Sequence, residues 1–174
     1  MQGRWMRGVL ALGVALLAVV SAQTQTRITI VALGASNTEG WGVLASEAYP
    51  ARLEALLQAR GIDATVVNAG IAGDTTGGML ARLERAVPAG THIVILQPGT
   101  NDERMGLGGE RAGNIEKMRS RLSSRQTKLI VIENEMLDAL PRKELREDGL
   151  HFTPTGYAIL AERTLPQVLA ALGK

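Results

Sequence analysis

The stretch that decides the fold is ITIVALGASNTEG, residues 28–40 of a 174-residue chain. Its first six residues are apolar or β-branched, which is typical of a strand buried on both faces of a parallel sheet. The small residues that follow predict a tight turn, and Ser36 lies in it. Ligands and chemistry collect at the carboxyl ends of such strands, so Ser36 is a candidate nucleophile. A hydroxyl at this point also suits a helix cap, and taken alone the cap is the simpler interpretation.

Similar apolar runs occur three more times, and amphipathic segments separate them. We expect strands at residues 27–33, 64–67, 92–96 and 128–132 and helices at about 50–61, 78–86, 110–122 and 155–172. In the second helix, Leu80 and Leu83 are expected to face inward and Arg82 outward. Strands that alternate with helices predict an α/β fold, in which helices cover both faces of a parallel sheet.

The first 22 residues have the pattern of a targeting segment. Arg4 and Arg7 precede thirteen apolar residues, and small residues follow up to Ala22. This pattern predicts a secretory signal peptide cleaved after Ala22, and an exported domain of residues 23–174 that is periplasmic or secreted and has no membrane span. Thirteen residues are too few to cross a bilayer comfortably, so an uncleaved anchor is the weaker alternative.

The composition argues against several classes of protein. The chain has 19 basic and 17 acidic residues, and removal of a leader with two arginines leaves a formally neutral domain. Phe, Trp and Tyr number five in total and no basic stripe occurs, which argues against nucleic-acid binding. Without cysteine, the chain forms no disulfide and offers no thiolate to a metal. We expect a single monomeric domain that binds no metal.

A second candidate site lies near the C-terminus, in Asp148-Gly149-Leu150-His151. In a helix-like turn, residues three apart share a face, so the Asp148 carboxylate could reach one ring nitrogen of His151. The other nitrogen would then be free to take a proton from a hydroxyl group. The second histidine, His92, begins an apolar strand far from any acidic partner, which favours a structural role.

Residues with useful chemistry also follow the second and third predicted strands. One loop contains Gly73 and the other contains Asn101. A glycine amide and an asparagine carboxamide donate hydrogen bonds without losing a proton, as stabilisation of a tetrahedral oxyanion requires. The neighbouring Asp74 and Asp102 are expected to fix these loops through hydrogen bonds from backbone amides.

These segments resemble, in order, the four motif blocks of the SGNH, or GDSL-type, hydrolases: Gly34-Ala35-Ser36-Asn37, Ala72-Gly73-Asp74-Thr75, Gly99-Thr100-Asn101-Asp102 and Asp148-Gly149-Leu150-His151. The resemblance covers nearly all of residues 23–174. Residues 68–83 are most similar to the branch of bacterial multifunctional acyl-CoA thioesterase I enzymes, which are also lysophospholipases and arylesterases. The resemblance implies a three-layer αβα sandwich around a flavodoxin-like parallel sheet of four to five strands.

Carried onto this chain, the resemblance implies that Ser36 is the nucleophile, His151 the general base and Asp148 the residue that orients the imidazole. The amides of Ser36 and Gly73 and the side chain of Asn101 would form the oxyanion hole. The implied activity is hydrolysis of small-molecule acyl esters, aryl esters, lysophospholipids or thioesters through an acyl-enzyme, without a cofactor. The alternatives are a carbohydrate O-acetylesterase and a non-catalytic envelope protein that binds acylated glycans or lipids.

Two features depart from the family pattern. Ala35 stands where the family usually has aspartate before the serine, and only fifteen residues, 133–147, separate the fourth strand from Asp148. Thioesterase-like members usually fit another helix and strand into that interval. We therefore expect a four-stranded sheet with a trimmed edge, a short helix or turn within residues 136–147, and a more open substrate groove.

Some residues have two open interpretations. The glycine-rich segment 103–109 could border the site or be a plain connection. Trp41 and Met105 could line a groove for an acyl chain, or be ordinary core or surface residues. Glu133 and Glu135 could contact substrate, although solvation at the surface is the simpler expectation.

Overall fold

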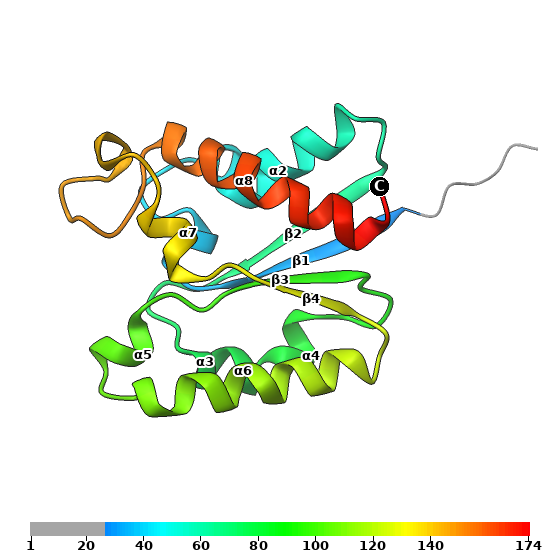
Figure 1. Ribbon diagram of the computed structural model, residues 1–174, viewed down its shortest axis with the longest axis horizontal. Helices are drawn as coiled ribbons and strands as arrows, with labels where there is room; N and C mark the ends of the chain where they lie inside the picture. The colour runs from blue at the N-terminus through cyan, green and yellow to red at the C-terminus, as the bar shows by residue number, and fades with distance from the viewer. Residues whose placement is uncertain (1–26) are drawn as a thin grey trace, which may run out of the picture.

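The computed structural model describes residues 27–174, so the predicted leader and its cleavage point lie outside the described residues. Four parallel strands form a sheet in the order β2-β1-β3-β4: β1 (Ile28–Gly34), β2 (Ala64–Gly70), β3 (Ile93–Gln97) and β4 (Lys128–Val131). Because they run in one direction, their carboxyl ends meet at one edge (Figure 1). The predicted parallel sheet is confirmed, with four strands in the described part of the chain.

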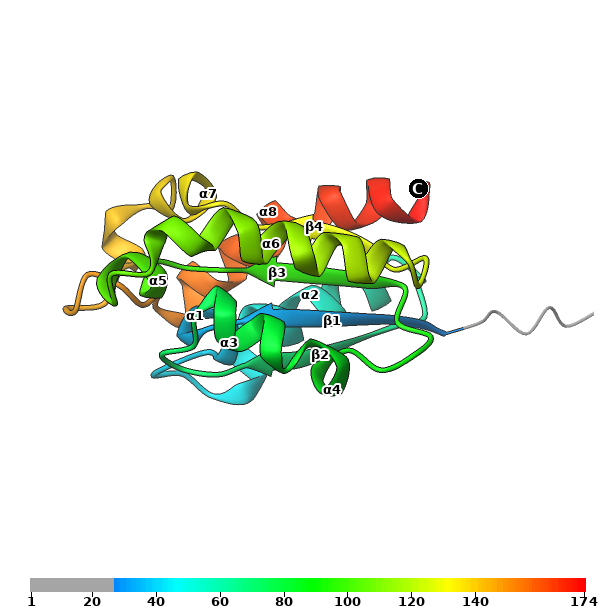
Figure 2. The same cartoon turned by 90° about the horizontal axis from the view of Figure 1, so that it is seen from below.

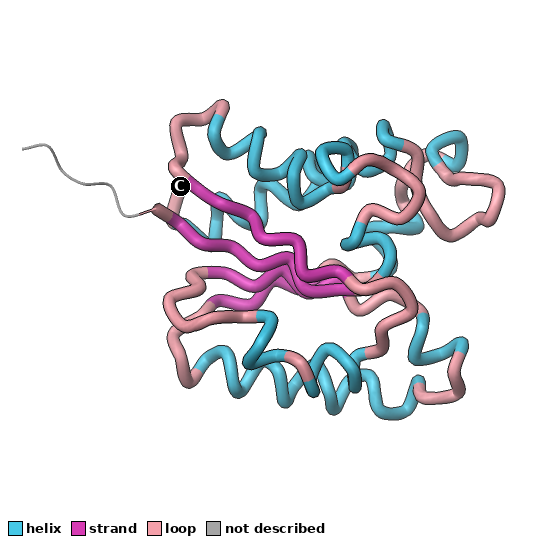
Figure 3. Tube along the Cα trace, turned by 180° about the vertical axis from the view of Figure 1, so that it is seen from behind, coloured by secondary structure: helices cyan, strands magenta, loops and turns pink. Residues whose placement is uncertain are grey.

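Helices cover both faces of the sheet. On one face lie α2 (Tyr49–Gln58) and α8 (Pro154–Leu172), and on the other lie α3 (Thr76–Ala81), α4 (Leu83–Ala86) and α6 (Gly108–Ser123) (Figures 1 and 2). Figure 3 shows the sheet enclosed between these two helical layers. The three-layer αβα sandwich is therefore confirmed. The remaining short elements are α1 (Ser36–Glu39), η1 (Ala45–Glu47), α5 (Asn101–Arg104), α7 (Asn134–Asp138) and η2 (Arg142–Glu144).

The central strand β1 is buried on both faces, as its sequence predicts. Ile30 and Ala32 pack in the core beneath α2 and α8, whereas Val31 and Leu33 pack in the core beneath α3, α4 and α6. All four side chains are fully buried. Because successive residues of a strand point to opposite faces, one apolar run supplies both cores. The end of β1 is therefore fixed by packing from both sides.

The last helix begins and ends at residues suited to those positions. Thr153 precedes it, and its hydroxyl oxygen accepts a hydrogen bond from the amide of Gly156 at 3.1 Å. Pro154 occupies the first position, where a missing backbone N–H costs nothing. The helix ends at Gly173, which adopts a φ of 72°. The loop that carries Asp148 and His151 thus runs into a firmly started helix.

The predicted helix at 78–86 is wrong in detail. The chain forms two shorter helices, α3 and α4, which meet at Arg82. The Arg82 side chain is only 9% exposed and forms an ion pair with Asp74, so its predicted outward orientation is also wrong. The apolar periodicity of a helix does not account for a carboxylate in a preceding loop, and here that carboxylate turns the arginine inward.

The short interval before Asp148 contains α7 and η2 and no strand. An isolated antiparallel bridge pairs Leu145 with Phe152 and closes the loop that contains Asp148 and His151. The expected trimmed sheet edge and short helix are both present. Within residues 27–174, no helix is long and apolar enough to cross a membrane.

Candidate active site

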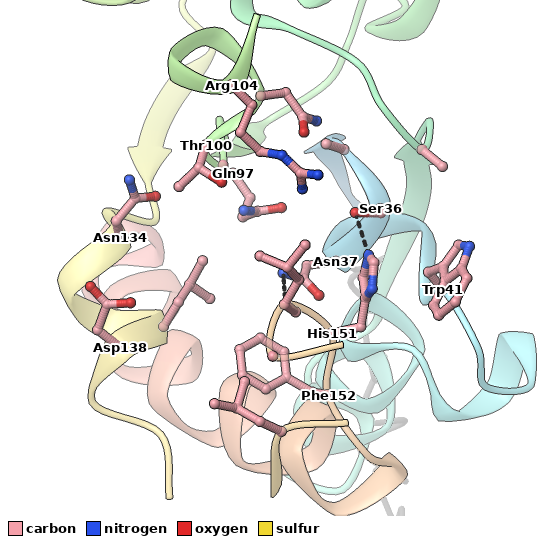
Figure 4. A pocket seen from close by; sticks show the side chains of 18 of the residues that line it. Ser36, Asn37, Trp41, Gln97, Thr100, Arg104, Asn134, Asp138, His151 and Phe152 are labelled. Atoms are coloured by element: carbon pink, nitrogen blue, oxygen red, sulfur yellow. Dashed lines mark hydrogen bonds between the residues drawn. The ribbon is translucent and has the colours of Figure 1, made fainter. Parts of the chain in front are cut away.

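Ser36 and His151 meet at the carboxyl edge of the sheet. Ser36 is the first residue of α1, just beyond the end of β1, and His151 lies in the loop before α8. The Nε2 atom of His151 is 2.9 Å from Oγ of Ser36 (Figure 4). The Nδ1 atom of the same ring is 2.7 Å from Oδ2 of Asp148. The structure thus brings the three residues into one hydrogen-bonded line.

Asp148 is held by the turn that it opens. Its Oδ1 atom accepts hydrogen bonds from the amides of Leu150 at 2.9 Å and His151 at 3.0 Å, while Oδ2 faces the imidazole. Gly149 adopts a φ of 67°, which favours glycine, so the segment is a tight turn and not a helical one. The hydrogen bond with the imidazole, followed by the bonds from the two amides, holds the pKa of Asp148 well below its ordinary value. The carboxylate is therefore ionised and available to orient the ring.

Three candidate oxyanion donors lie around the same cavity. It is lined by Ser36, Gly73 and Asn101, and the backbone amides of Ser36 and Gly73 donate to no acceptor in the described part of the chain. Gly73 has a φ of 77°, and nothing lies within 4 Å of the point where a Cβ would be. The Nδ2 atom of Asn101 donates to the carbonyl of Asp74 at 2.8 Å. Since an amide nitrogen carries two hydrogens, one remains for a substrate.

Two paired glycines let α1 lie directly on the sheet edge. Gly34 and Gly70 are neighbours at the ends of β1 and β2. A Cβ on Gly70 would lie 2.1 Å from the backbone nitrogen of Glu39, and one on Gly34 would lie 2.1 Å from Oγ1 of Thr38. Thr38 is fully buried and donates to Oε1 of Gln97 at 3.1 Å. The helix that begins with the candidate nucleophile is therefore held close against the sheet.

A buried ion pair joins the loop of Gly73 to the end of β1. The Nε atom of Arg82 is 2.7 Å from Oδ2 of Asp74, and its Nη2 atom donates to the carbonyl of Gly34 at 3.1 Å. Both side chains of the pair are about nine-tenths buried, at 9% and 11% exposed. Guanidinium groups suit this position because one planar group can bind two acceptors at once. This contact was not predicted from the sequence.

The predicted loop-fixing roles of Asp74 and Asp102 are confirmed. Asp74 accepts from the amide of Thr75 at 3.0 Å. Asp102, which is 1% exposed, accepts from the amide of Thr76 at 3.0 Å and from its hydroxyl at 2.6 Å. The bonds of Asp102 connect the segments that carry Gly73 and Asn101.

Asn37 ties the Ser36 turn to the His151 loop. Its Nδ2 atom donates to the carbonyl of Leu150 at 3.1 Å, and its Oδ1 atom accepts from the hydroxyl of Tyr157 at 3.1 Å. Burial raises the pKa of Tyr157 to about 12, so its hydroxyl remains a donor at neutral pH. Asn37 was part of the recognised motif, but Tyr157 lies among the apolar residues of a helix and carries no local signal in the sequence.

Trp41 stacks on the imidazole of His151. The two ring centroids are 4.4 Å apart and the planes differ by 27°. The guanidinium of Arg146 lies 5.8 Å from the centroid of the Trp41 ring and donates to the carbonyl of Gly42 at 3.1 Å. Trp41 is 45% exposed, so one face of the imidazole is covered by an aromatic ring at the surface. Trp41 was expected at most to line the groove.

The candidate residues open into a cavity of about 980 Å³. Its lining includes four apolar side chains from the short interval before His151 and its flank, namely Leu137, Leu140, Leu145 and Phe152. Met105 and Trp41 also line it, as does Arg104 from the glycine-rich segment, so that segment borders the site. A cavity with an apolar part and a few polar groups at one point is typical of a small-molecule site.

The other candidates lie away from the reacting atoms. His92 accepts a hydrogen bond from the amide of Thr29 at 3.1 Å through Nδ1, in agreement with a structural role. Glu133 is exposed, with an oxygen 3.8 Å from Arg111, and neither it nor Glu135 lines the cavity. Among residues 27–174, no group of three His, Cys, Asp or Glu side chains is arranged to hold a metal ion.

Comparison with known families and proteins points to ester hydrolases. The model of the GDSL-like lipase/acylhydrolase family matches residues 32–142. The chain is 30% identical over 124 residues to an arylesterase of Vibrio mimicus, covering 70% of this chain and 62% of the relative. It is also 30% identical over 132 residues to esterase TesA of Pseudomonas aeruginosa, covering 73% of this chain and 64% of the relative. The chain thus spans less than two thirds of the length of both relatives.

Solved structures share the fold. A crystal structure of TesA superposes with a TM-score of 0.75, covering 82% of this chain and 99% of that chain at 22% sequence identity. At this identity the match shows that the two chains share an architecture.

Proposed function

The chain belongs to the GDSL-like lipase/acylhydrolase family, and on that premise we propose that it is a serine esterase that cleaves acyl esters or thioesters through an acyl-enzyme. Ser36 is the proposed nucleophile, His151 the general base, and Asp148 the residue that orients the base. One observation supports the proposal more strongly than the others. The imidazole is within hydrogen-bond distance of Oγ of Ser36 on one side and of the Asp148 carboxylate on the other, at 2.9 Å and 2.7 Å.

The first half of the proposed reaction acylates the enzyme. Oγ of Ser36 attacks the carbonyl carbon while Nε2 of His151 takes the hydroxyl proton. The carbonyl oxygen becomes an oxyanion, which the amides of Ser36 and Gly73 and the second Nδ2 hydrogen of Asn101 would stabilise. The imidazolium then gives its proton to the leaving oxygen or sulfur. The alcohol or thiol departs, and the acyl group remains on Ser36.

Deacylation repeats these steps with water. His151 takes a proton from a water molecule as its oxygen attacks the acyl carbon. When the second tetrahedral intermediate collapses, the proton returns to Oγ of Ser36 and the carboxylic acid leaves. The ionised Asp148 stabilises the imidazolium in both halves of the cycle. No step of this proposed reaction uses a group other than the residues of the chain, the substrate and water.

The proposed substrates carry an apolar acyl group of short to medium length. Leu137, Leu140, Leu145 and Phe152 line the cavity and would contact the methylene groups of such a chain. Aryl esters, thioesters and lysophospholipids have leaving groups that would lie near the half-exposed Trp41 at the cavity lining. We propose these classes as substrates.

Turnover of p-nitrophenyl esters of graded chain length tests the proposal. The wild-type protein should release p-nitrophenol, and Ser36→Ala should not, while Ser123→Ala, an exposed serine on α6, should match the wild type. Labelling by a fluorophosphonate should modify Ser36. An unlabelled, inactive wild type would instead support the non-catalytic binding protein. Turnover confined to acetyl groups on sugars would support the carbohydrate O-acetylesterase.

We also propose that the enzyme is exported after removal of residues 1–22, and that it acts as a monomer. Two arginines followed by an apolar run and a small-residue cleavage point support the export. Mass spectrometry of the protein recovered from the periplasm or medium should give a chain that begins at Gln23. A chain that retains the leader would contradict this.

A further inference from the structure

Arg104 extends into the cavity from the helix that begins with Asn101. In Figure 4 its guanidinium points from α5 toward Ser36, and Trp41 lies on the opposite side of Ser36 in this view. The side chain of Arg104 makes no hydrogen bond or ion pair with any residue in the described range 27–174, and its backbone amide donates to the carbonyl of Thr100. A guanidinium group has five N–H donors and stays charged at all working pH values. In this cavity all five donors are available to a ligand.

The acidic neighbours of Arg104 are engaged elsewhere. Asp102 is buried against Thr76, and the Glu103 carboxylate lies 3.7 Å from the guanidinium of Arg111. Around the cavity lining, two arginines, Arg104 and Arg142, face a single carboxylate. That carboxylate, Asp138 on α7, forms no ion pair with either arginine in the described structure. Arg104 is therefore left without an acidic partner at the cavity lining, while the ionised Asp148 is engaged with His151.

Arg104 lies on the side of Ser36 where the acyl group of a bound ester would point. His151 gives its proton to the leaving group, so the leaving group must lie on the side of the imidazole and the Trp41 ring that covers it. The acyl group then points away from His151, toward the part of the cavity lined by Gln97, Thr100 and Arg104. A charge carried by the acyl chain would reach the guanidinium, whereas a charge on the leaving group would not.

We propose that this cavity selects esters whose acyl chain carries a carboxylate, that is, half-esters of dicarboxylic acids, and that Arg104 binds this carboxylate. The inference rests on the proposed esterase function and specifies its substrate class. The terminal carboxylate pairs with the guanidinium in the bidentate geometry that the two groups share. Arg104 is thus a specificity-determining residue and takes no part in bond breaking.

Matched pairs of substrates test this proposal. One member is the p-nitrophenyl monoester of adipic or suberic acid, and the other is the same ester with its free carboxyl methylated. The wild type should have a kcat/KM about five- to tenfold higher for the charged member. Arg104→Gln should abolish this preference. Arg85→Gln, which removes an exposed arginine on α4 away from the cavity, should retain the preference.

Each outcome supports or overturns the proposal. Equal turnover of the two members by the wild type, or an unchanged preference in Arg104→Gln, would overturn the proposal but leave the esterase function intact. If neither member is hydrolysed, the esterase function fails, and calorimetry on Ser36→Ala then tests carboxylate binding by Arg104. Monomethyl adipate should bind to this variant. Its affinity should fall about fivefold or more when Arg104→Gln is added. Lysophosphatidic acid, whose phosphate belongs to the leaving group, should show no dependence on Arg104. Dependence there would place the anion on the leaving-group side and overturn the assignment.

Discussion

The wall of the cavity that carries Ser36 and the wall that carries His151 are held in different ways. Ser36 follows a strand buried on both faces, α1 lies against paired glycines, and the buried Arg82–Asp74 ion pair binds the end of β1. His151 lies in a loop whose neighbour Leu150 is 41% exposed, and it is positioned by hydrogen bonds and one stacked ring. The position of the proposed nucleophile therefore depends on the core, and that of the proposed base depends on a few polar contacts. Substitutions in the two walls should separate stability from activity.

The largest effect is expected from removal of the base. His151→Ala should lower kcat by about 10⁶-fold, because loss of the base from a catalytic triad costs nearly as much as loss of the whole triad. The free energy of unfolding should change by less than about 1 kcal/mol, as is usual for a side chain outside the core. Steady-state kinetics and urea unfolding measure the two quantities. A large loss of stability would show that the base wall also supports the core.

The reverse pattern is expected for the nucleophile wall. Arg82→Ala leaves the Asp74 carboxylate buried without an ion-pair partner, so the free energy of unfolding should fall by about 3–5 kcal/mol. The matched control is Arg27→Ala. Its ion pair with Asp63 is exposed, with side chains at 68% and 47%, and its loss should cost less than about 1 kcal/mol. Urea unfolding measures both free energies. Equal losses in the two variants would contradict the expected difference between the buried and the exposed ion pair.

The link between the walls should affect activity more than stability. Asn37→Ala removes the bonds to the Leu150 carbonyl and the Tyr157 hydroxyl. Small displacements of reacting groups are costly, so kcat should fall about 10- to 100-fold, with KM little changed. Tyr157→Phe removes only the second bond and should produce a smaller loss. The same loss in both variants would show that the bond to Leu150 contributes nothing.

The smallest effect concerns the acid stability of the base wall. The pKa of Asp148 is lower in the folded protein than its ordinary value of 3.8, so its ionised form favours folding. This contribution is complete well above pH 3.8 and is lost as the pH falls toward the lower folded pKa. The difference in unfolding free energy between wild type and Asp148→Asn should therefore be constant near neutral pH. It should shrink progressively as the pH falls toward and below 3.8. Urea midpoints measured between about pH 2 and pH 7 would show this trend, and a difference that grows in acid would contradict it.

The two walls also differ in how far they were predictable from sequence. Strand β1 and the turn at Ser36 were predicted because buried parallel strands leave a continuous apolar run, and that signal is local. The contact between Asp148 and His151 was predicted because the two residues are three apart. The contact between Asn37 and Tyr157 spans 120 residues and leaves no local pattern. The predicted outward orientation of Arg82 was wrong because its partner Asp74 is in a preceding loop, outside the helix from which the orientation was inferred.

The short helices were missed for a related reason. The helices α1 and α5 have four residues each, which is about one turn and too short to show a period. They form because the carboxyl ends of the strands and the flanking loops hold them. Yet α1 carries Ser36 and α5 carries both Asn101 and Arg104, so the least predictable helices hold much of the site.

The hydrogen bond between Ser36 and His151 joins residues 115 positions apart, with almost the whole sandwich between them. A partly folded or partly synthesised chain can contain the serine, in its turn, without an acid–base partner. Catalytic competence should thus appear late, when the last helix docks and closes the loop before it. If the chain is exported as proposed above, this topology would act as a safeguard, because a chain that has not finished folding would have no working active site.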